Sequence, residues 1–146
     1  MSVEFFLDSN VVIYAFSSTE TDKRCRSRAL LETSGAWVSI QVLNELANVM
    51  MRKFNQTSSA IRKVVNQISS ISKTYHINSN SIGHALNIVE CYHYAYYDSL
   101  IIAAALESGC TMLYTEDMQH GQVIDSQLTI INPFRDVHHE HPAHLQ

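Results

Sequence analysis

Phe5-Phe6-Leu7-Asp8-Ser9-Asn10-Val11 is the stretch of this 146-residue sequence that says most about its fold. An apolar run stops at three polar residues that suit a turn or a helix cap, which is typical of a buried strand leading into a helix. Similar short apolar runs predict strands at residues 36–40, 111–114 and 128–131, with a brief extended segment at 75–77.

Helical patterns fill the intervals between these strands. They cover residues 11–16, 19–31, 42–54, 57–73, 81–92 and 98–108. Alternating strands and helices predict an α/β fold, a three-layer α/β/α domain with a mostly parallel sheet of about four to five strands. We expect one domain over residues 1–135, followed by a loose His-containing tail at 136–146 that is unrelated to catalysis.

The composition excludes several classes of protein. With 46% hydrophobic and 16% charged residues, the chain can bury a core and is not disordered throughout. No apolar run is long enough to span a bilayer, and the N-terminus does not resemble a signal peptide. The three scattered cysteines suit reduced thiols, so we expect a cytoplasmic protein with no membrane partner.

The net charge of −4 conceals a basic segment. Residues 23–63 hold eight of the ten basic side chains and only two acids, whereas the remainder is strongly acidic. Because binding depends on the local field, this asymmetry leaves a nucleic-acid ligand open despite the acidic total.

Four acids lie near the ends of predicted elements. Asp8 ends the first strand, Asp117 follows the third, and Glu45 lies one turn into the helix after the second. Asp98 begins the apolar helix that leads into the third strand. Open parallel sheets bind ligands beyond the carboxyl ends of their strands, so this fold could gather the four acids at one edge.

Each acid also has an ordinary structural explanation. Asp8 and Asp98 suit helix caps, and Asp117 suits a turn. Glu45 is harder to dismiss, because a helical projection places it with Arg52 at the margin of the apolar face rather than opposite it.

Four clustered carboxylates raise one another's pKa and could not all stay ionised unaided. A divalent cation removes this conflict, and carboxylate ligands favour Mg²⁺ or Mn²⁺ over zinc. Such a cation polarises a phosphoryl oxygen and lowers the pKa of water, so the acids predict metal-assisted phosphodiester hydrolysis.

The four acids lie in Phe5-Phe6-Leu7-Asp8-Ser9-Asn10-Val11, Ser39-Ile40-Gln41-Val42-Leu43-Asn44-Glu45-Leu46, Tyr97-Asp98-Ser99-Leu100-Ile101-Ile102-Ala103-Ala104-Ala105 and Leu113-Tyr114-Thr115-Glu116-Asp117. In this order, these stretches resemble the PIN-domain family, the ribonuclease fold of VapC-type toxins in bacterial toxin–antitoxin pairs. The Glu116-Asp117-Met118-Gln119-His120-Gly121 form resembles a branch described as predicted nucleic-acid-binding. The resemblance covers residues 3–134.

The resemblance implies a catalytic set that also binds Mg²⁺ or Mn²⁺, namely Asp8, Glu45, Asp98 and Asp117. The last family acid commonly follows a Thr or Ser by two positions, which selects Asp117, although Glu116 could turn inward in its place. We expect Asn10, Ser99 and Glu116 to support the site around these acids, while Asn10 equally suits a helix cap.

Together these observations predict a Mg²⁺- or Mn²⁺-dependent endoribonuclease, and the resemblance leaves open that it is the toxin of a toxin–antitoxin pair. The candidates for holding the RNA backbone are Arg24, Arg26, Arg28, Arg52 and Lys53. The resemblance further implies a homodimer and leaves an antitoxin protein as a possible partner.

Two other functions remain open. A catalytically inactive PIN domain would bind RNA or a protein without cleaving. A phosphatase of the haloacid-dehalogenase type also begins with a strand ending in Asp. It needs a second Asp two residues later, where this chain has Asn10, so it is the weaker alternative.

Overall fold

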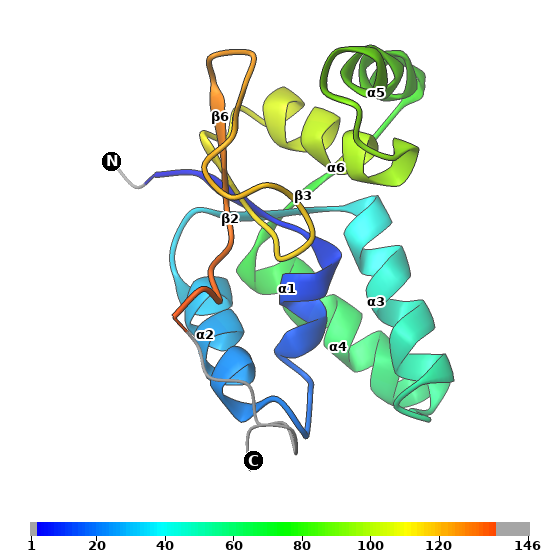
Figure 1. The fold of residues 1–146 in the computed structure, drawn as a ribbon. Coiled ribbons are helices and arrows are strands. Elements are labelled where there is room, and N and C mark those ends of the chain that lie inside the picture. Colours follow the sequence, from blue (N-terminus) through cyan, green and yellow to red (C-terminus); the bar gives the residue numbers. More distant parts are fainter. Residues whose placement is uncertain (1–2, 137–146) are drawn as a thin grey trace.

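The computed structural model describes residues 3–136, which form six helices and a six-stranded sheet (Figure 1). In chain order the elements are β1 (Phe5–Leu7), α1 (Ser9–Tyr14), α2 (Thr21–Glu32), β2 (Ala36–Ser39), α3 (Ile40–Arg52), α4 (Ser58–Ile71), β3 (Lys73–Tyr75), α5 (Ser79–Tyr92), α6 (Tyr96–Glu107), β4 (Met112–Tyr114), β5 (Val123–Ile124) and β6 (Leu128–Ile131). Apart from Asp136, the tail expected at 136–146 lies outside the described residues.

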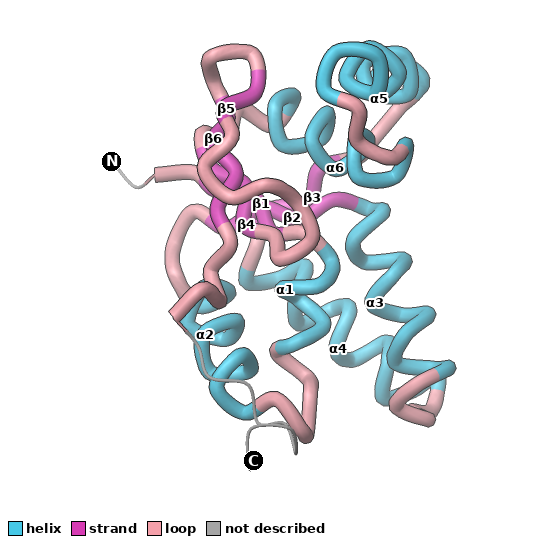
Figure 2. Tube along the Cα trace, viewed as in Figure 1, coloured by secondary structure: helices cyan, strands magenta, loops and turns pink. Residues whose placement is uncertain are grey.

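The layers match the architecture expected from the sequence. Helices α5 and α6 cover one face of the sheet, and α1 to α4 lie on the other (Figure 2). Eight consecutive residues of α6, from Ser99 to Leu106, are buried, as its unbroken apolar sequence predicts. This confirms the three-layer α/β/α domain.

The sheet has the strand order β3-β2-β1-β4-β6-β5. Strand β1 lies between β2 and β4 and pairs parallel with both, Phe5 opposite Ala36 on one side and Met112 on the other. The chain thus builds outward in opposite directions from β1. In open parallel sheets, ligands bind at such a reversal, beyond the carboxyl ends of the central strands. Asp8 follows β1 in this region, which we call the crevice.

The sheet differs from the expectation at its two edges. Strand β3 begins two residues before the expected segment, and β5 is an additional strand that pairs antiparallel with β6. Asp125 and Ser126 both have positive φ between these two strands, as tight hairpin turns require. A two-residue strand is too short to leave a hydrophobic pattern, so β5 is invisible in the sequence.

Gly35 permits β1 and β2 to lie side by side. Its φ is +102°, and a Cβ at this position would lie 2.3 Å from the carbonyl oxygen of Val3. The Phe5 amide donates to the Gly35 carbonyl at 3.0 Å. Any side chain here would force the first two strands apart.

Among the helices of residues 3–136, none combines the length and apolarity needed to cross a membrane.

Candidate active site

The four predicted acids come from four different elements around the β1 crevice. Asp8 directly follows β1, Glu45 lies in α3, Asp98 lies in the first turn of α6, and Asp117 lies in the segment after β4. Asp8 is 3% exposed, whereas Glu45 and Asp98 are half-buried and Asp117 is exposed. The group therefore runs from the protein interior to its surface.

Asp8 is held by donors from two strand ends. Its Oδ1 accepts from the Ser9 amide at 2.7 Å, which caps α1, and its Oδ2 accepts from Thr115 Oγ1 at 2.8 Å. Asn10 Nδ2 adds a longer contact to Oδ2 at 3.3 Å. The helix cap considered for Asp8 is thus real, and it leaves the carboxylate facing the residues that follow β4.

The acids influence one another's pKa values. Burial, with a smaller contribution from the negative charges of Glu45 and Asp98, raises the pKa of Asp8 to about 6 against the opposing hydrogen bonds from Thr115 and Ser9. The pKa of Asp98 is also raised, by burial first and then by Asp117 and Glu45. A cation in this crevice would relieve the repulsion.

Glu45 is oriented by two residues that the sequence did not single out. Ser9 Oγ donates to its Oε2 at 2.7 Å, and Gln41 Nε2 donates to its Oε1 at 3.0 Å. The same Gln41 nitrogen lies 3.2 Å from the carbonyl oxygen of Tyr97, beside Asp98 at the start of α6. Gln41 therefore connects α3 to α6, and its position one turn before Glu45 is the only sequence signal for this role.

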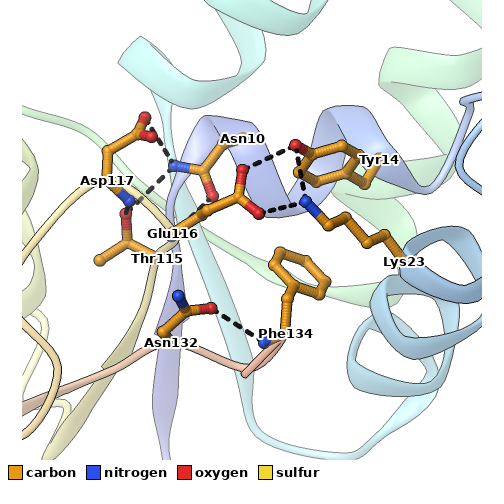
Figure 3. Close-up of polar contacts among 8 residues, drawn as sticks. All are labelled: Asn10, Tyr14, Lys23, Thr115, Glu116, Asp117, Asn132 and Phe134. Atoms are coloured by element: carbon orange, nitrogen blue, oxygen red, sulfur yellow. Dashed lines mark hydrogen bonds and ion pairs between the residues drawn. The ribbon is translucent and has the colours of Figure 1, made fainter. Parts of the chain in front are cut away.

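Asn10 connects the acids after β1 and β4. Its Nδ2 donates to Thr115 Oγ1 and to Asp117 Oδ2, each at 3.1 Å, and its Oδ1 accepts from the Glu116 amide at 3.1 Å (Figure 3). The Asp117 amide donates to Thr115 Oγ1 at 3.2 Å. Thr115 is fully buried, so this Thr fixes the direction of the segment that carries Asp117.

Glu116 takes a different direction from its neighbour Asp117. Its carboxylate accepts from Tyr14 Oη at 2.6 Å and pairs with Lys23 Nζ at 2.5 Å (Figure 3). In this structure the inward turn considered for Glu116 is not adopted.

Ser99 does not touch an acid in the part of the chain that the structure describes. It is buried, and its Oγ lies 3.4 Å from the carbonyl oxygen of Tyr94. Its position on the inner face of α6 explains the difference, because Asp98 one residue earlier points in another direction around the helix.

The three arginines of α2 are tied to backbone carbonyls. Arg24 donates to Ser17, Arg26 to Pro133 and Arg28 to Ala15, at 3.0, 2.7 and 2.8 Å. Each guanidinium retains further N–H donors, so these bonds limit but do not remove its capacity to bind phosphate. Arg52 and Lys53, at the end of α3, are exposed.

The donor set suits a hard divalent cation that keeps some of its water. Within residues 3–136, no three His, Cys, Asp or Glu side chains lie where they would hold an ion by themselves. The four acids nevertheless offer oxygen atoms as metal ligands, and the pKa is raised for at least two of them, Asp8 and Asp98. Mg²⁺ binds through few carboxylates with water completing its shell, so these residues fit such an ion.

Comparison with known proteins places this geometry in context. The sequence model of the PIN domain matches residues 5–124. No curated protein matches the sequence.

Several solved structures share the fold. A toxin–antitoxin complex from Klebsiella pneumoniae is 19% identical, with a TM-score of 0.67 over 90% of this chain and 98% of that one. A DNA-bound VapBC from Salmonella typhimurium is 21% identical, with a TM-score of 0.64 over 88% and 97% of the two chains. VapC20 of Mycobacterium tuberculosis, described as a sarcin-ricin loop cleaving toxin, is 14% identical, with a TM-score of 0.63 over 78% and 92%. At these identities the comparisons establish the fold alone.

Proposed function

The chain belongs to the PIN-domain family, and from this premise we propose that it is a divalent-metal-dependent endoribonuclease that hydrolyses RNA phosphodiester bonds. The observation that carries the proposal is a hydrogen-bond network that links three of the four acids. Ser9 donates to both Asp8 and Glu45, and Asn10 donates to both Asp8 and Asp117. The charges of Asp117 and Glu45, after burial, raise the pKa of Asp98. Ligand sites of parallel sheets lie at the carboxyl ends of adjacent strands, and acids with perturbed pKa values there are candidates for such a site.

Each carboxylate has a distinct part in this proposal. Asp8 is the fixed anion at the base of the crevice, because burial and three donors hold its orientation. Ser9 and Gln41 aim Glu45 toward the same region. Asp98 and Asp117 lie nearer to solvent, where substrate enters.

A Mg²⁺ or Mn²⁺ ion held by these carboxylates would polarise the scissile phosphate and lower the pKa of an attacking water. The exposed Arg52 and Lys53, together with the remaining donors of the α2 arginines, would hold the RNA backbone.

The decisive experiment compares cleavage of a fluorogenic single-stranded RNA with Mn²⁺, with Mg²⁺ and with chelator. We expect Asp98→Asn to lower the rate by about 100-fold or more, the scale on which loss of one catalytic group acts, while RNA affinity persists. Glu90→Gln is the matched control, since Glu90 is an exposed acid on α5. Cleavage that survives Asp98→Asn or chelation would refute the proposal.

We further propose that the protein is the toxin of a toxin–antitoxin pair, since the similar structures include such complexes. Induced expression of the wild type should then arrest growth of the host, and Asp98→Asn should not. A small open reading frame beside the gene should encode a protein that restores growth. Growth arrest by both the wild type and Asp98→Asn would contradict a nuclease toxin.

One observation favours a second candidate, an inactive domain that binds RNA or a protein. In residues 3–136, no three His, Cys, Asp or Glu side chains are arranged around a preformed ion site. Both carboxylate oxygens of Glu45 already accept a hydrogen bond, from Ser9 and from Gln41. Wild-type protein that binds RNA with a salt-dependent affinity, yet shows no metal-dependent cleavage, would select this function over the nuclease.

A further inference from the structure

Two adjacent carboxylates after β4 have opposite environments. Asp117 is exposed and accepts from Asn10 in the crevice, whereas Glu116 is paired with Lys23 and Tyr14 (Figure 3). Nothing in the chemistry of Glu and Asp dictates this choice, since either side chain could bind a cation. The surroundings of Glu116 therefore decide which acid enters the site.

Lys23 is the unusual member of these surroundings. Its side chain is only 3% exposed, whereas Arg26 and Arg28 of the same helix are exposed. Nζ lies 2.5 Å from Glu116 Oε2 and 3.3 Å from Tyr14 Oη, and it lies 4.7 and 5.5 Å from the ring centroids of Tyr14 and Phe134. A buried ammonium group needs an anion, and Glu116 is the carboxylate that the structure places beside it.

Helix α1 transmits this pairing to Asp117. Tyr14 and Asn10 lie one turn apart on α1, so they share a face of that helix. Tyr14 donates to the Glu116 carboxylate, while Asn10 accepts from the Glu116 amide and donates to Asp117. One face of α1 therefore forms hydrogen bonds with the Glu116 backbone and with the side chains of both Glu116 and Asp117.

We propose that Lys23 and Tyr14 are positioning residues that hold Glu116 away from the crevice and thereby fix Asp117 as the acid that enters it. The inference rests on the proposed function, because it concerns a carboxylate of that site. Without the Lys23 charge, Glu116 would lose its counter-ion beside another carboxylate, and the two would compete for Asn10 and for the cation.

The first test needs neither metal nor activity. In chelator, the side-chain amide resonances of Asn10 are followed by ¹H–¹⁵N NMR in wild type, Lys23→Met, Lys23→Met/Glu116→Gln and Lys73→Met. We expect Lys23→Met to shift and broaden the Asn10 signals, and the double variant to return them toward wild type. Lys73→Met is the matched control, since the Lys73–Glu4 pair spans 3.0 Å at the surface, with 61% and 36% of the two side chains exposed.

The second test follows Mn²⁺ affinity and steady-state kinetics of the folded variants. Lys23→Met should weaken Mn²⁺ binding about tenfold, as loss of a residue that orients a ligand does, and lower kcat without raising KM for RNA. The double variant should recover most of both losses. A purely structural role predicts a lower melting temperature with unchanged Mn²⁺ affinity.

Asn10 signals that stay unchanged in folded Lys23→Met would overturn the inference. If Lys23→Met does not fold, Tyr14→Phe removes only the hydroxyl and should move the same signals and the Mn²⁺ affinity in the same direction. Failure of the wild type to cleave RNA would refute the proposed function alone, because the metal-free Asn10 measurement still decides whether Lys23 positions Asp117.

Discussion

Asp8 shows how one residue serves both the fold and the site. It caps α1, contacts the end of β4 through Thr115, and lies beside the other acids with a pKa raised to about 6. The unfolded chain would have an Asp pKa near its ordinary value of 3.8. The fold therefore keeps a carboxylate where its ionised form is disfavoured, as sites that bind cations often do.

This shift predicts a pH dependence of stability in the metal-free protein. Between about pH 4 and pH 6 the folded state holds a proton on Asp8 that the unfolded state has released, so stability falls as pH rises through this window and then levels off. Asp8→Asn lacks this titration. Relative to that variant, the wild type should lose on the order of 2–3 kcal/mol of unfolding free energy from pH 4 to pH 6.5.

Urea denaturation in chelator at several pH values measures this difference, and comparing the two proteins cancels the titration of groups that Asp8 does not influence. At neutral pH, millimolar Mn²⁺ should reduce this loss of unfolding free energy in the wild type relative to Asp8→Asn. If the difference in unfolding free energy between the two proteins is constant with pH, ionisation of Asp8 does not destabilise the fold.

At the scale of elements, α2 has a mixed role. Its arginines hold the helix to the loop after α1 and to the segment after β6, and its buried Lys23 faces Glu116. The basic segment seen in the sequence is therefore partly structural. Arg52 and Lys53, at the end of α3, are the more exposed cations.

Replacing Arg24, Arg26 and Arg28 with Ala should consequently affect both stability and RNA binding. Loss of three hydrogen bonds from charged donors should lower the unfolding free energy by about 1 kcal/mol or more per bond. Arg52→Ala/Lys53→Ala should instead weaken RNA binding and reduce its salt slope by up to roughly one per phosphate contact, with little change in stability. Equal stability losses in both variants would contradict this division.

For the whole molecule, the sheet order determines what meets in the crevice. Placing β1 between β2 and β4 brings residues near positions 8, 45 and 117 to the same end of neighbouring strands. A cation bound there would connect α1, α3, α6 and the segment after β4, so its effect should extend to global unfolding.

We therefore expect Mn²⁺ to raise the melting temperature of the whole domain. At ten times its Kd, a ligand that binds only the folded state stabilises it by about 1.4 kcal/mol. The rise in melting temperature should be smaller in Asp8→Asn and Glu45→Gln, and unchanged in Glu90→Gln. A wild-type transition that millimolar Mn²⁺ leaves unmoved would count against the metal site.

The surface of the molecule also predicts assembly. Ile82 and Leu86 lie one turn apart on α5 and are about half exposed, and Tyr97 at the start of α6 is 70% exposed. A two-fold dimer would bury the same patch on both chains. Sedimentation at about 50 µM should show a dimer, the concentration range of a moderate interface, and Leu86→Glu should produce monomers. A wild-type monomer at this concentration would contradict the prediction.

The sequence alone determined the main elements of the fold and predicted the four candidate acids. Apolar runs and helical periodicity are local signals, so they located the main strands and the buried α6. The same local pattern placed Asp8 and Asp117 after strands, Asp98 at the start of a helix and Glu45 one turn into another. That these places lie at one edge was an expectation from the general behaviour of parallel sheets.

Tertiary structure alone decided the partners of those acids. Lys23 looks in sequence like the exposed cations around it, and only packing against Tyr14, Phe134 and a glutamate 93 positions away distinguishes it. Gln41, the direction of Glu116 and the short strand β5 are likewise set by contacts with distant segments. Local patterns record which face of an element is apolar, whereas the pairing of polar groups depends on how the elements meet.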